Sequence, residues 1–372
     1  MLSFVWATRP DKRRWHVLAS AAWWTNMSPS YASPMGPPVN ALSPCTPYDP
    51  RHQPLIMGAS GLLCAIVINY FGADKTERCL ASLSGQAIDT LVLVDNSADQ
   101  DERHRLEAIL SSLNDRRCRF IIRTRFNDTN LGFGKAINQV IRDDQESTGG
   151  HDYYLLINND AEATPGLVAG LLLAAATHPD AALVSPRIRW GDDDVGYYWY
   201  QPFLGHVSRV PWPGSFSYLS GCCLLVDAAL AHNGALFDED FFMYGEDIDL
   251  TARAVRTGRA IVCVEHLLVI HEGSGSSRHG GLFYEYQVAR GHVLLAGKLA
   301  DHRVTRILFT AGRALYLTAR AMVRSLRYRR RTPIRALLLA WTGRAVNTPL
   351  ESAAPHDNRS TASLSSASPT NR

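Results

Sequence analysis

The chain has 372 residues, of which 46% are hydrophobic and 20% are charged, and this composition excludes disorder along the whole length. The formal net charge is only +3, but residues 302–345 hold eleven arginines and no lysine, aspartate or glutamate, so the rest of the chain is net negative. Seven cysteines without a CxxC pair predict neither a disulfide framework nor a zinc site, and they favour a reduced, cytoplasmic setting.

Residues 1–56 predict a disordered N-terminal extension. A basic patch at Lys12–Arg14 precedes a short apolar run, which faintly resembles a signal peptide, but eight prolines follow within residues 28–54. A proline-rich composition of this kind does not build a packed core. We therefore expect a chain that begins at Met57 to fold as the full chain does.

From residue 57 onward, short apolar runs alternate with helical patterns. Leu62–Ile68 fits a buried strand better than a membrane-spanning helix, because three glycines interrupt the uncharged stretch around it. Four further runs have strand length, and they are Thr90–Val94, Arg119–Thr124, Tyr153–Ile157 and Ala181–Ser185. Asp74 and Glu77 predict a capping box, and Thr164 with Pro165 predicts the start of a helix that ends near His178. The alternation predicts an α/β fold with a mainly parallel central sheet flanked by helices.

Polar residues follow several of these strands. In a parallel sheet the ligand site lies beyond the carboxyl ends of the strands, so Asn69, Asp95 and the triplet Asn158-Asn159-Asp160 are expected at one edge. Carboxylates at such an edge suit a hard cation that shares its ligands with phosphate. A lone GxG at Gly132 and Gly134 is weak evidence for a dinucleotide fingerprint, and this disfavours a nicotinamide oxidoreductase.

A second acidic cluster stands at the start of a predicted helix that ends at Gly258. It contains Glu246, Asp247 and Asp249. Asp249 also fits a purely structural role, because it can stabilise the helix N-terminus and pair with Arg253 one turn later. The same helix-starting role is the alternative for Asp247.

Six motifs, in order and spacing, resemble the family 2 inverting glycosyltransferases, and the bacterial rhamnosyltransferases of surface polysaccharides are the most similar subgroup. The motifs are Asn69-Tyr70, Val94-Asp95-Asn96-Ser97, Asn130-Leu131-Gly132, Leu156–Asp160, Ser220-Gly221-Cys222 and Phe237–Asp249. The resemblance covers about residues 62–277. It implies a GT-A fold, a nucleotide-sugar donor and a divalent metal, either Mg²⁺ or Mn²⁺.

The resemblance implies roles for individual residues. Asp95 matches the acid that contacts the base or ribose of the donor, although a turn-forming aspartate is the alternative, and Asn69 is placed in the same donor site. Asn158-Asn159-Asp160 occupies the position of the metal-binding DxD, with Asn158 and Asn159 expected at the donor. Because Asn158 replaces the first acid, Asp160 is left as the main carboxylate ligand. Asp247 matches the catalytic base, and Glu246 stands beside it.

Further positions complete the expected site. A histidine in the position of His271 can join the metal and the diphosphate, although a lone histidine after a strand is more often structural. The Gly/Ser-rich segment Glu272–Ser277 could form a lid. Asn130 and Lys135 begin a helix whose N–H groups and cation could meet diphosphate, or Lys135 is simply solvated. The aromatic stretch Tyr197–Trp212 fits the acceptor side, with ordinary packing as the alternative.

The arginine-rich end predicts an amphipathic helix. Arg306, Arg313, Arg320 and Arg327 recur every seven residues, with Arg303 and Arg324 near the same face. Apolar residues fall elsewhere on the helix, and they include Leu308, Leu315, Met322 and Leu326. We expect the arginines to bind an anionic membrane surface, and the alternative is a helix docked on the catalytic domain. The chain has no nucleic-acid-binding module, so nucleic acid is not an expected partner.

These expectations combine into one organisation and one function. The disordered extension over 1–56 precedes a GT-A domain over 57–277, a basic helical region over 278–345 and a disordered tail over 346–372. The expected reaction is metal-dependent, inverting transfer of L-rhamnose from dTDP-L-rhamnose to a lipid-linked saccharide, in cell-surface polysaccharide synthesis at the inner face of the cytoplasmic membrane. Asp247 would remove the proton of the acceptor hydroxyl, without a covalent nucleophile. The alternatives are another hexosyl or galactofuranosyl donor, or a non-catalytic nucleotide-sugar-binding scaffold.

Overall fold

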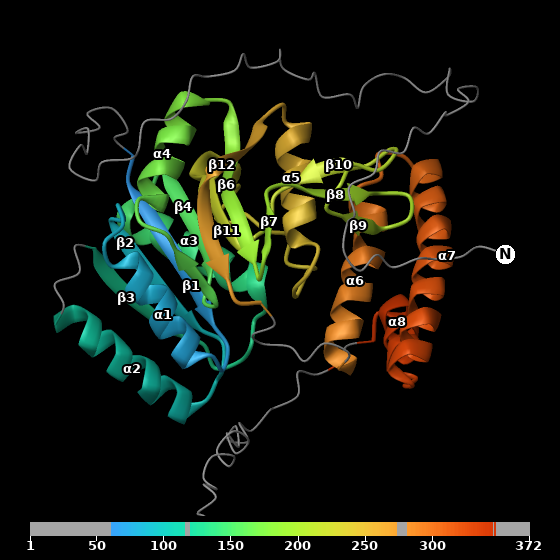
Figure 1. Cartoon of the computed structure of the whole chain (residues 1–372), viewed down its shortest axis with the longest axis horizontal. Coiled ribbons are helices and arrows are strands. Elements are labelled where there is room, and N and C mark those ends of the chain that lie inside the picture. Colours follow the sequence, from blue (N-terminus) through green and yellow to red (C-terminus); the bar gives the residue numbers. More distant parts are fainter. Residues whose placement is uncertain (1–60, 116–119, 274–280, 345, 347–372) are drawn as a thin grey trace, which may run out of the picture. The chain divides into compact units, whose positions relative to one another are not determined.

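The computed structural model describes residues 61–115, 120–273, 281–344 and 346, which form an α/β core followed by three helices (Figure 1). The expected extension over 1–56 and nearly all of the expected tail over 346–372 lie outside the described residues. Most of the expected lid, from residue 274 onward, lies outside them as well. Among the described residues, no helix is both long and apolar enough to cross a membrane.

The core is a nine-stranded sheet in the order β3-β2-β1-β4-β11-β6-β12-β5, with β7 beside β6. Strands β1, β2, β3 and β4 pair in parallel, and so do β6 and β12, whereas β11 runs antiparallel between β4 and β6. The strands are β1 (Leu63–Asn69), β2 (Thr90–Asp95), β3 (Ile121–Phe126), β4 (Tyr153–Asn158), β5 (Ala161–Ala163), β6 (Ala181–Trp190), β7 (Asp193–Val195), β11 (Cys223–Asp227) and β12 (Ala260–His271). The parallel part places the ends of β1, β2 and β4 at one edge.

Helices cover both faces of this sheet. One apolar cluster packs α1 (Ala73–Leu83), α2 (Gln100–Asp115) and α4 (Leu167–Thr177) against one face. A second cluster packs α3 (Phe133–Thr148) and α5 (Glu246–Arg256) against the other. The mainly parallel sheet flanked by helices is thus confirmed, and each predicted strand has a counterpart in β1, β2, β3, β4 or β6.

Two helices begin at other residues, or with other capping groups, than the sequence predicts. Asp74 and Glu77 form no capping box, because α1 begins at Ala73 after Gly72, and the Ala73 N–H donates to Glu102 Oε1 at 2.8 Å. A buried carboxylate from α2 thus takes the role that the sequence pattern assigned to a local side chain. The fourth helix begins at Leu167 rather than directly after Thr164, whose hydroxyl donates to a carbonyl of β12.

Beyond the core, three helices form a separate packing unit with its own apolar cluster. They are α6 (Leu282–Lys298), α7 (Arg303–Tyr328) and α8 (Thr332–Thr342). A small antiparallel sheet of β8 (Tyr198–Gln201), β9 (His206–Ser208) and β10 (Phe216–Tyr218) lies between α5 and α7 in Figure 1. Tyr200, Tyr218, Ile248 and Leu295 join this sheet to α5 and α6.

Helix α7 turns the middle of its arginine face inward, so the prediction that this whole face meets a membrane is wrong. Arg313 is fully buried, with its guanidinium 5.7 Å from the Tyr200 ring centroid and Nη2 3.3 Å from the Tyr200 hydroxyl. Arg324 donates from Nε to Glu285 of α6 at 3.0 Å, and Arg320 lies 3.9 Å from the same carboxylate. The buried acid and ring come from distant segments, so the helical period alone could not reveal which way the face points.

Candidate active site at the carboxyl ends of the strands

The ends of β1 and β2 are joined by a buried polar network. Asn69 donates from Nδ2 to Asp95 Oδ1 at 2.9 Å and to Glu102 Oε1 at 3.0 Å. Asp95 Oδ1 also accepts from the backbone N–H and the hydroxyl of Ser97, at 3.1 and 2.7 Å. All four side chains are at most 4% exposed, so the network is worth more than isolated surface bonds and fixes the strand ends rigidly.

Asn159 joins the same network. Its amide donates to Asn69 Oδ1 at 3.3 Å and to Thr76 Oγ1 at 3.1 Å. The structure thus brings Asn69, Asp95 and Asn159 together, as predicted from their strand-end positions. Asn69 is entirely buried, and both ends of its amide bond protein groups. This geometry supports a positioning role for Asn69, which holds the Asp95 carboxylate in place at the end of β2.

Asp160 and His271 form a pair although 111 positions separate them. His271 Nε2 lies 3.1 Å from Asp160 Oδ1, and both residues are partly buried. Burial opposes ionisation of the Asp160 carboxyl, but the hydrogen bond and charge of His271 outweigh it and lower the pKa of Asp160. Burial likewise disfavours the charged imidazole, yet the bonds to Asp160 and Cys222 raise the pKa of His271 to about 10.

This pair fits a divalent cation that takes its remaining ligands from phosphate and water. One carboxylate is available, and the imidazole becomes a second ligand when a cation displaces its proton, since metals bind the neutral ring. Among the described residues, no group of three or more histidine, cysteine, aspartate or glutamate side chains is suited to a metal. A hard cation often binds through one or two carboxylates plus substrate phosphates, so the small donor set is no obstacle. Lys75 adds positive charge, since its charge also lowers the pKa of Asp160. Asn158 is partly exposed at the end of β4.

The second acidic pair stands in the first turn of α5. Burial raises the pKa of both Glu246 and Asp247, and the Asp247 charge raises the pKa of Glu246 further. The Gly221 and Ile248 N–H groups donate to Asp247 at 3.4 and 2.9 Å and act in the opposite direction on Asp247 alone. Glu246 therefore keeps its proton more readily, while Asp247 is the better candidate for a base that is ionised near neutrality.

The segment Gly221-Cys222 links the two acidic centres. Gly221 donates its N–H to Asp247, and the Cys222 carbonyl accepts from the Asn158 N–H at 2.9 Å, next to the Asp160 centre. The Cys222 side chain is also among the groups that raise the pKa of His271. From the sequence alone, Cys222 belongs only to the Ser220-Gly221-Cys222 motif of the resemblance and has no assigned role. One short segment therefore holds the candidate base and the candidate cation site in a fixed relation.

The loop before α3 is held against the segment that leads to α5. Asn130 Oδ1 accepts from the Gly132 N–H at 2.9 Å, and the Phe133 N–H donates to the Phe242 carbonyl at 2.9 Å. Asn96 Nδ2 donates to the Gly132 carbonyl at 3.0 Å, which ties the loop to the end of β2. The structure thus uses Asn130 to shape the loop. Lys135 is exposed on α3.

Gly132 makes this contact testable. Its φ is +79°, and an added Cβ would lie 2.3 Å from the Phe242 carbonyl oxygen, so Gly132→Ala should lower the free energy of unfolding by about 2 kcal/mol or more. Gly258 is a matched control, because its φ is +78° but nothing lies within 4 Å of an added Cβ. Gly258→Ala should lower it by only about 1 kcal/mol. Urea denaturation measures both values, and equal losses would contradict the close contact.

The aromatic residues expected on the acceptor side have different surroundings, and one of them pairs with Tyr218 of β10. Tyr200 is fully buried and His206 bonds the Tyr316 hydroxyl at 2.6 Å, so ordinary packing explains both. Tyr198 and Tyr218 form a tilted pair with ring centroids 5.7 Å apart. Burial is the main cause that raises the pKa of both phenols, and the negative charge of Asp247 raises it further. This pair therefore lies near the candidate base.

Trp190 is a site residue that the sequence did not single out. Its ring lies edge-on to His271 with centroids 5.9 Å apart, and it is 42% exposed. An added Cβ at Gly273 would lie 2.7 Å from the Trp190 indole nitrogen, so the chain passes closely over this ring. The exposed ring therefore forms one wall beside the Asp160 centre.

Comparisons with known proteins show which sequences this chain is similar to. Residues 64–234 match the family model described as glycosyl transferase family 2. The N-acetylglucosaminyl-diphospho-decaprenol L-rhamnosyltransferase of Mycobacterium tuberculosis (strain CDC 1551 / Oshkosh) is 26% identical to this chain over 256 residues. The match covers 58% of this chain and 78% of that relative, and the protein from strain ATCC 25618 / H37Rv gives the same values.

A solved structure shows the same fold. GalNAc-T7, solved with UDP, GalNAc and Mn²⁺, superposes with a TM-score of 0.51 at 13% identity, covering 64% of this chain and 48% of that one. A mannosyltransferase from Pyrobaculum calidifontis, solved with GDP-Man and Mn²⁺, covers 78% of this chain and 77% of its own, with 14% identity and a TM-score of 0.48. The likeness to GalNAc-T7 confirms the expected GT-A architecture.

Proposed function

We propose that the chain is a family 2 glycosyltransferase, which transfers a sugar from a nucleotide donor to a lipid-linked saccharide, because residues 64–234 match that family model. The observation that carries the proposal is the link through Gly221-Cys222. The Gly221 N–H bonds the Asp247 base, and the Cys222 carbonyl bonds the end of β4 next to the Asp160–His271 centre. A transferase needs both functions together, since a proton must leave the acceptor while charge develops on the departing diphosphate.

Asp247 takes the proton of the acceptor hydroxyl as that oxygen attacks the anomeric carbon from the face opposite the diphosphate. The Gly221 N–H holds the carboxylate in place, and Glu246 stays protonated beside it because it is buried. One displacement of this kind inverts the anomeric configuration. No nucleophile is required, and burial raises the pKa of both Cys222 and Cys223, which keeps these thiols protonated.

Asp160 and His271 would hold a divalent cation, either Mg²⁺ or Mn²⁺. When bound, this cation would neutralise the negative charge of the diphosphate. Asp95 would contact the base or ribose of the donor, because it closes β2 beside the network of Asn69 and Asn159. Asn158 would face the donor from the end of β4.

The donor proposed first is dTDP-L-rhamnose, and the acceptor is a saccharide on a polyprenyl diphosphate. The 26%-identical relative, a decaprenol-linked rhamnosyltransferase, supports both choices. Another hexosyl or galactofuranosyl donor is the nearest alternative. A set of nucleotide sugars, incubated with a GlcNAc-diphosphate lipid and Mg²⁺ or Mn²⁺, tests the proposal by mass spectrometry of the lipid product. If a nucleotide sugar binds but none of them is hydrolysed or gives a lipid product, the chain would instead be a non-catalytic binding scaffold.

The pH profile of transfer should report the environment of Asp247. Burial raises the pKa of this carboxyl above its ordinary value of 3.8, and only the ionised form accepts a proton. The value of kcat/KM should therefore fall as pH decreases through a midpoint clearly above 3.8. Initial rates measured from pH 4 to 8 on a short soluble acceptor test this. A rate that stays flat down to about pH 4 would exclude a buried carboxylate as the base.

A further inference from the structure

The outward face of α7 is apolar along most of its length. Six large residues on it are between 50 and 79% exposed, and we call them the outer apolar face: Val304, Ile307, Leu308, Leu315, Met322 and Leu326. Leu308, Leu315 and Met322 are seven residues apart, so they stack on one side of the helix over successive pairs of turns. The opposite side, with Arg313, Leu317 and Ala321, packs into the protein.

A contiguous apolar stripe of this size is unusual on a surface that meets only water. From residue 304 to residue 326 it extends roughly 33 Å along the helix axis. Isolated exposed leucines are ordinary, but a continuous patch marks a surface that another apolar medium covers. The stripe also cannot serve the internal core, because that core already occupies the other side of α7.

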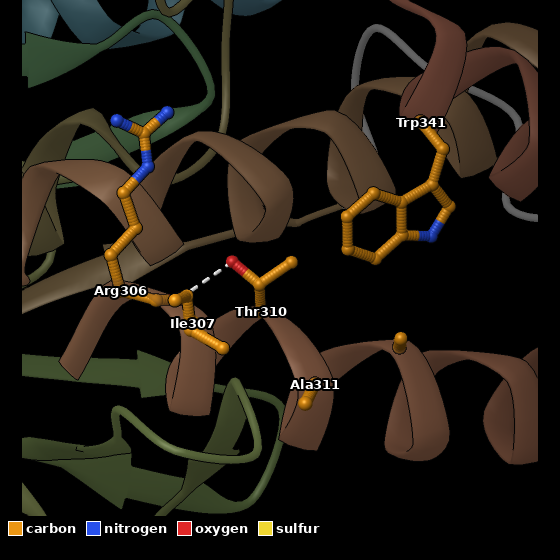
Figure 2. A pocket seen from close by; sticks show the side chains of 6 residues that line it. Arg306, Ile307, Thr310, Ala311 and Trp341 are labelled. Carbon is orange, nitrogen blue, oxygen red and sulfur yellow. Dashed lines mark hydrogen bonds between the residues drawn. The ribbon is translucent and has the colours of Figure 1, made fainter. Parts of the chain in front are cut away.

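A hollow beside the stripe enlarges the apolar surface. Figure 2 shows Ile307 and Ala311 on α7 with the Trp341 indole of α8 across from them, lining a hollow of about 610 Å³. The Thr310 hydroxyl at this hollow donates to the Arg306 carbonyl at 2.7 Å, so its proton is already bonded. The hollow therefore continues the outer apolar face toward α8.

Exposed arginines lie at one end of this apolar surface. Arg329, Arg330 and Arg331 are exposed directly after α7, and they line an open groove of about 460 Å³ together with Met322 and Leu326. Residues 303–344 contain no acidic residue at all. Two copies of the chain that met through α7 would bring arginines against arginines in either direction, so charge disfavours a second copy as the occupant.

We propose that α7 is a membrane-docking helix whose outer apolar face enters the headgroup boundary of an anionic phospholipid bilayer. Arg329–Arg331 then contact the lipid phosphates at one end of the helix, and the inward arginines hold α7 on the protein through Glu285 and Tyr200. The inference goes beyond sugar transfer, because it concerns a surface that binds lipid whether or not donor and acceptor are present. An apolar stripe with flanking arginines has the physical character of interfacial helices.

Sedimentation of the full chain with vesicles tests the apolar part, with no donor or acceptor in the mixture. The outer-face variant carries Leu308→Gln, Leu315→Gln, Met322→Gln and Leu326→Gln, and it should bind phosphatidylglycerol-rich vesicles at least about tenfold more weakly than the wild type. The matched control carries Ile121→Gln and Leu173→Gln, which remove exposed apolar residues from β3 and α4. This control should bind vesicles as the wild type does.

A second set of vesicle-binding experiments tests the contribution of the arginines. Substituting Arg329, Arg330 and Arg331 together by Gln should weaken binding by about 100-fold at low salt, and phosphatidylcholine vesicles should bind the wild type far less than anionic ones. Wild-type binding by the outer-face variant, confirmed as folded by circular dichroism, would overturn the proposal. A lipid-free wild-type dimer that the outer-face substitutions dissociate would also overturn it, since a second copy would then cover the face.

Discussion

Replacing Asp247 by asparagine should lower the rate of sugar transfer by at least about 100-fold while the nucleotide-sugar donor still binds. Asparagine has nearly the shape of aspartate and can still accept a bond from the Gly221 or Ile248 N–H, but it cannot take a proton from the acceptor. Single-turnover rates and calorimetric donor binding together measure the effect. Loss of rate and donor affinity in equal proportion would point to a disturbed pocket rather than a missing base.

Stability supplies the control for this variant. Burial raises the pKa of Asp247 in the folded chain, so ionisation of this group at neutral pH disfavours the folded state, and Asp247→Asn should not reduce the free energy of unfolding. Asp249 is the matched comparison on the same helix, because it is buried and accepts from Arg253 Nε at 2.8 Å. Asp249→Asn should reduce that free energy by about 1–3 kcal/mol and leave the turnover of the folded fraction nearly unchanged.

Replacing Asp160 by alanine should weaken donor binding in Mg²⁺ or Mn²⁺ at least about tenfold, but change it little in the presence of a chelator. The reason is that this carboxylate would hold the cation that bridges protein and diphosphate. Calorimetric titration of nucleotide sugar, with metal and with chelator, measures the difference. His271→Ala should act in the same direction if the imidazole shares the cation.

A neighbouring acid provides the control. Glu162 lies two residues further along, on β5, and its partly exposed carboxylate pairs with Arg78 at 3.2 Å. Glu162→Ala should leave metal-dependent donor affinity unchanged. If Asp160→Ala weakens binding equally with and without metal, the carboxylate supports the fold instead of a cation.

The strands and the strand-end placement of the acids could be predicted because both are local properties. Short β-branched runs end at polar residues, and a parallel sheet brings those ends together, so Asn69, Asp95 and Asn159 meet as expected. The capping of α1 could not be predicted, because the Glu102 carboxylate that bonds its first N–H comes from another helix.

The partners within the site were hidden for the same reason. Nothing in the sequence pairs His271 with Asp160 across 111 positions, or aims the Gly221 N–H at Asp247. The direction of the arginine face on α7 also depends on distant groups, since Glu285 and Tyr200 draw the middle arginines inward. Periodicity reveals that a helix has two faces, whereas tertiary partners decide which face is buried. The catalytic and binding roles of the named residues stay predictions.

The stereochemistry of the product tests the central claim most directly. Base catalysis by Asp247 in a single displacement predicts that the new glycosidic bond has the anomeric configuration opposite to that of the nucleotide sugar. NMR of the purified lipid-linked product, compared with the donor, reads this configuration from the one-bond carbon–proton coupling constant at the anomeric centre. A product with inverted configuration is the predicted result. A product that retains the donor configuration would contradict the account, because a single displacement from the face opposite the diphosphate cannot give retention.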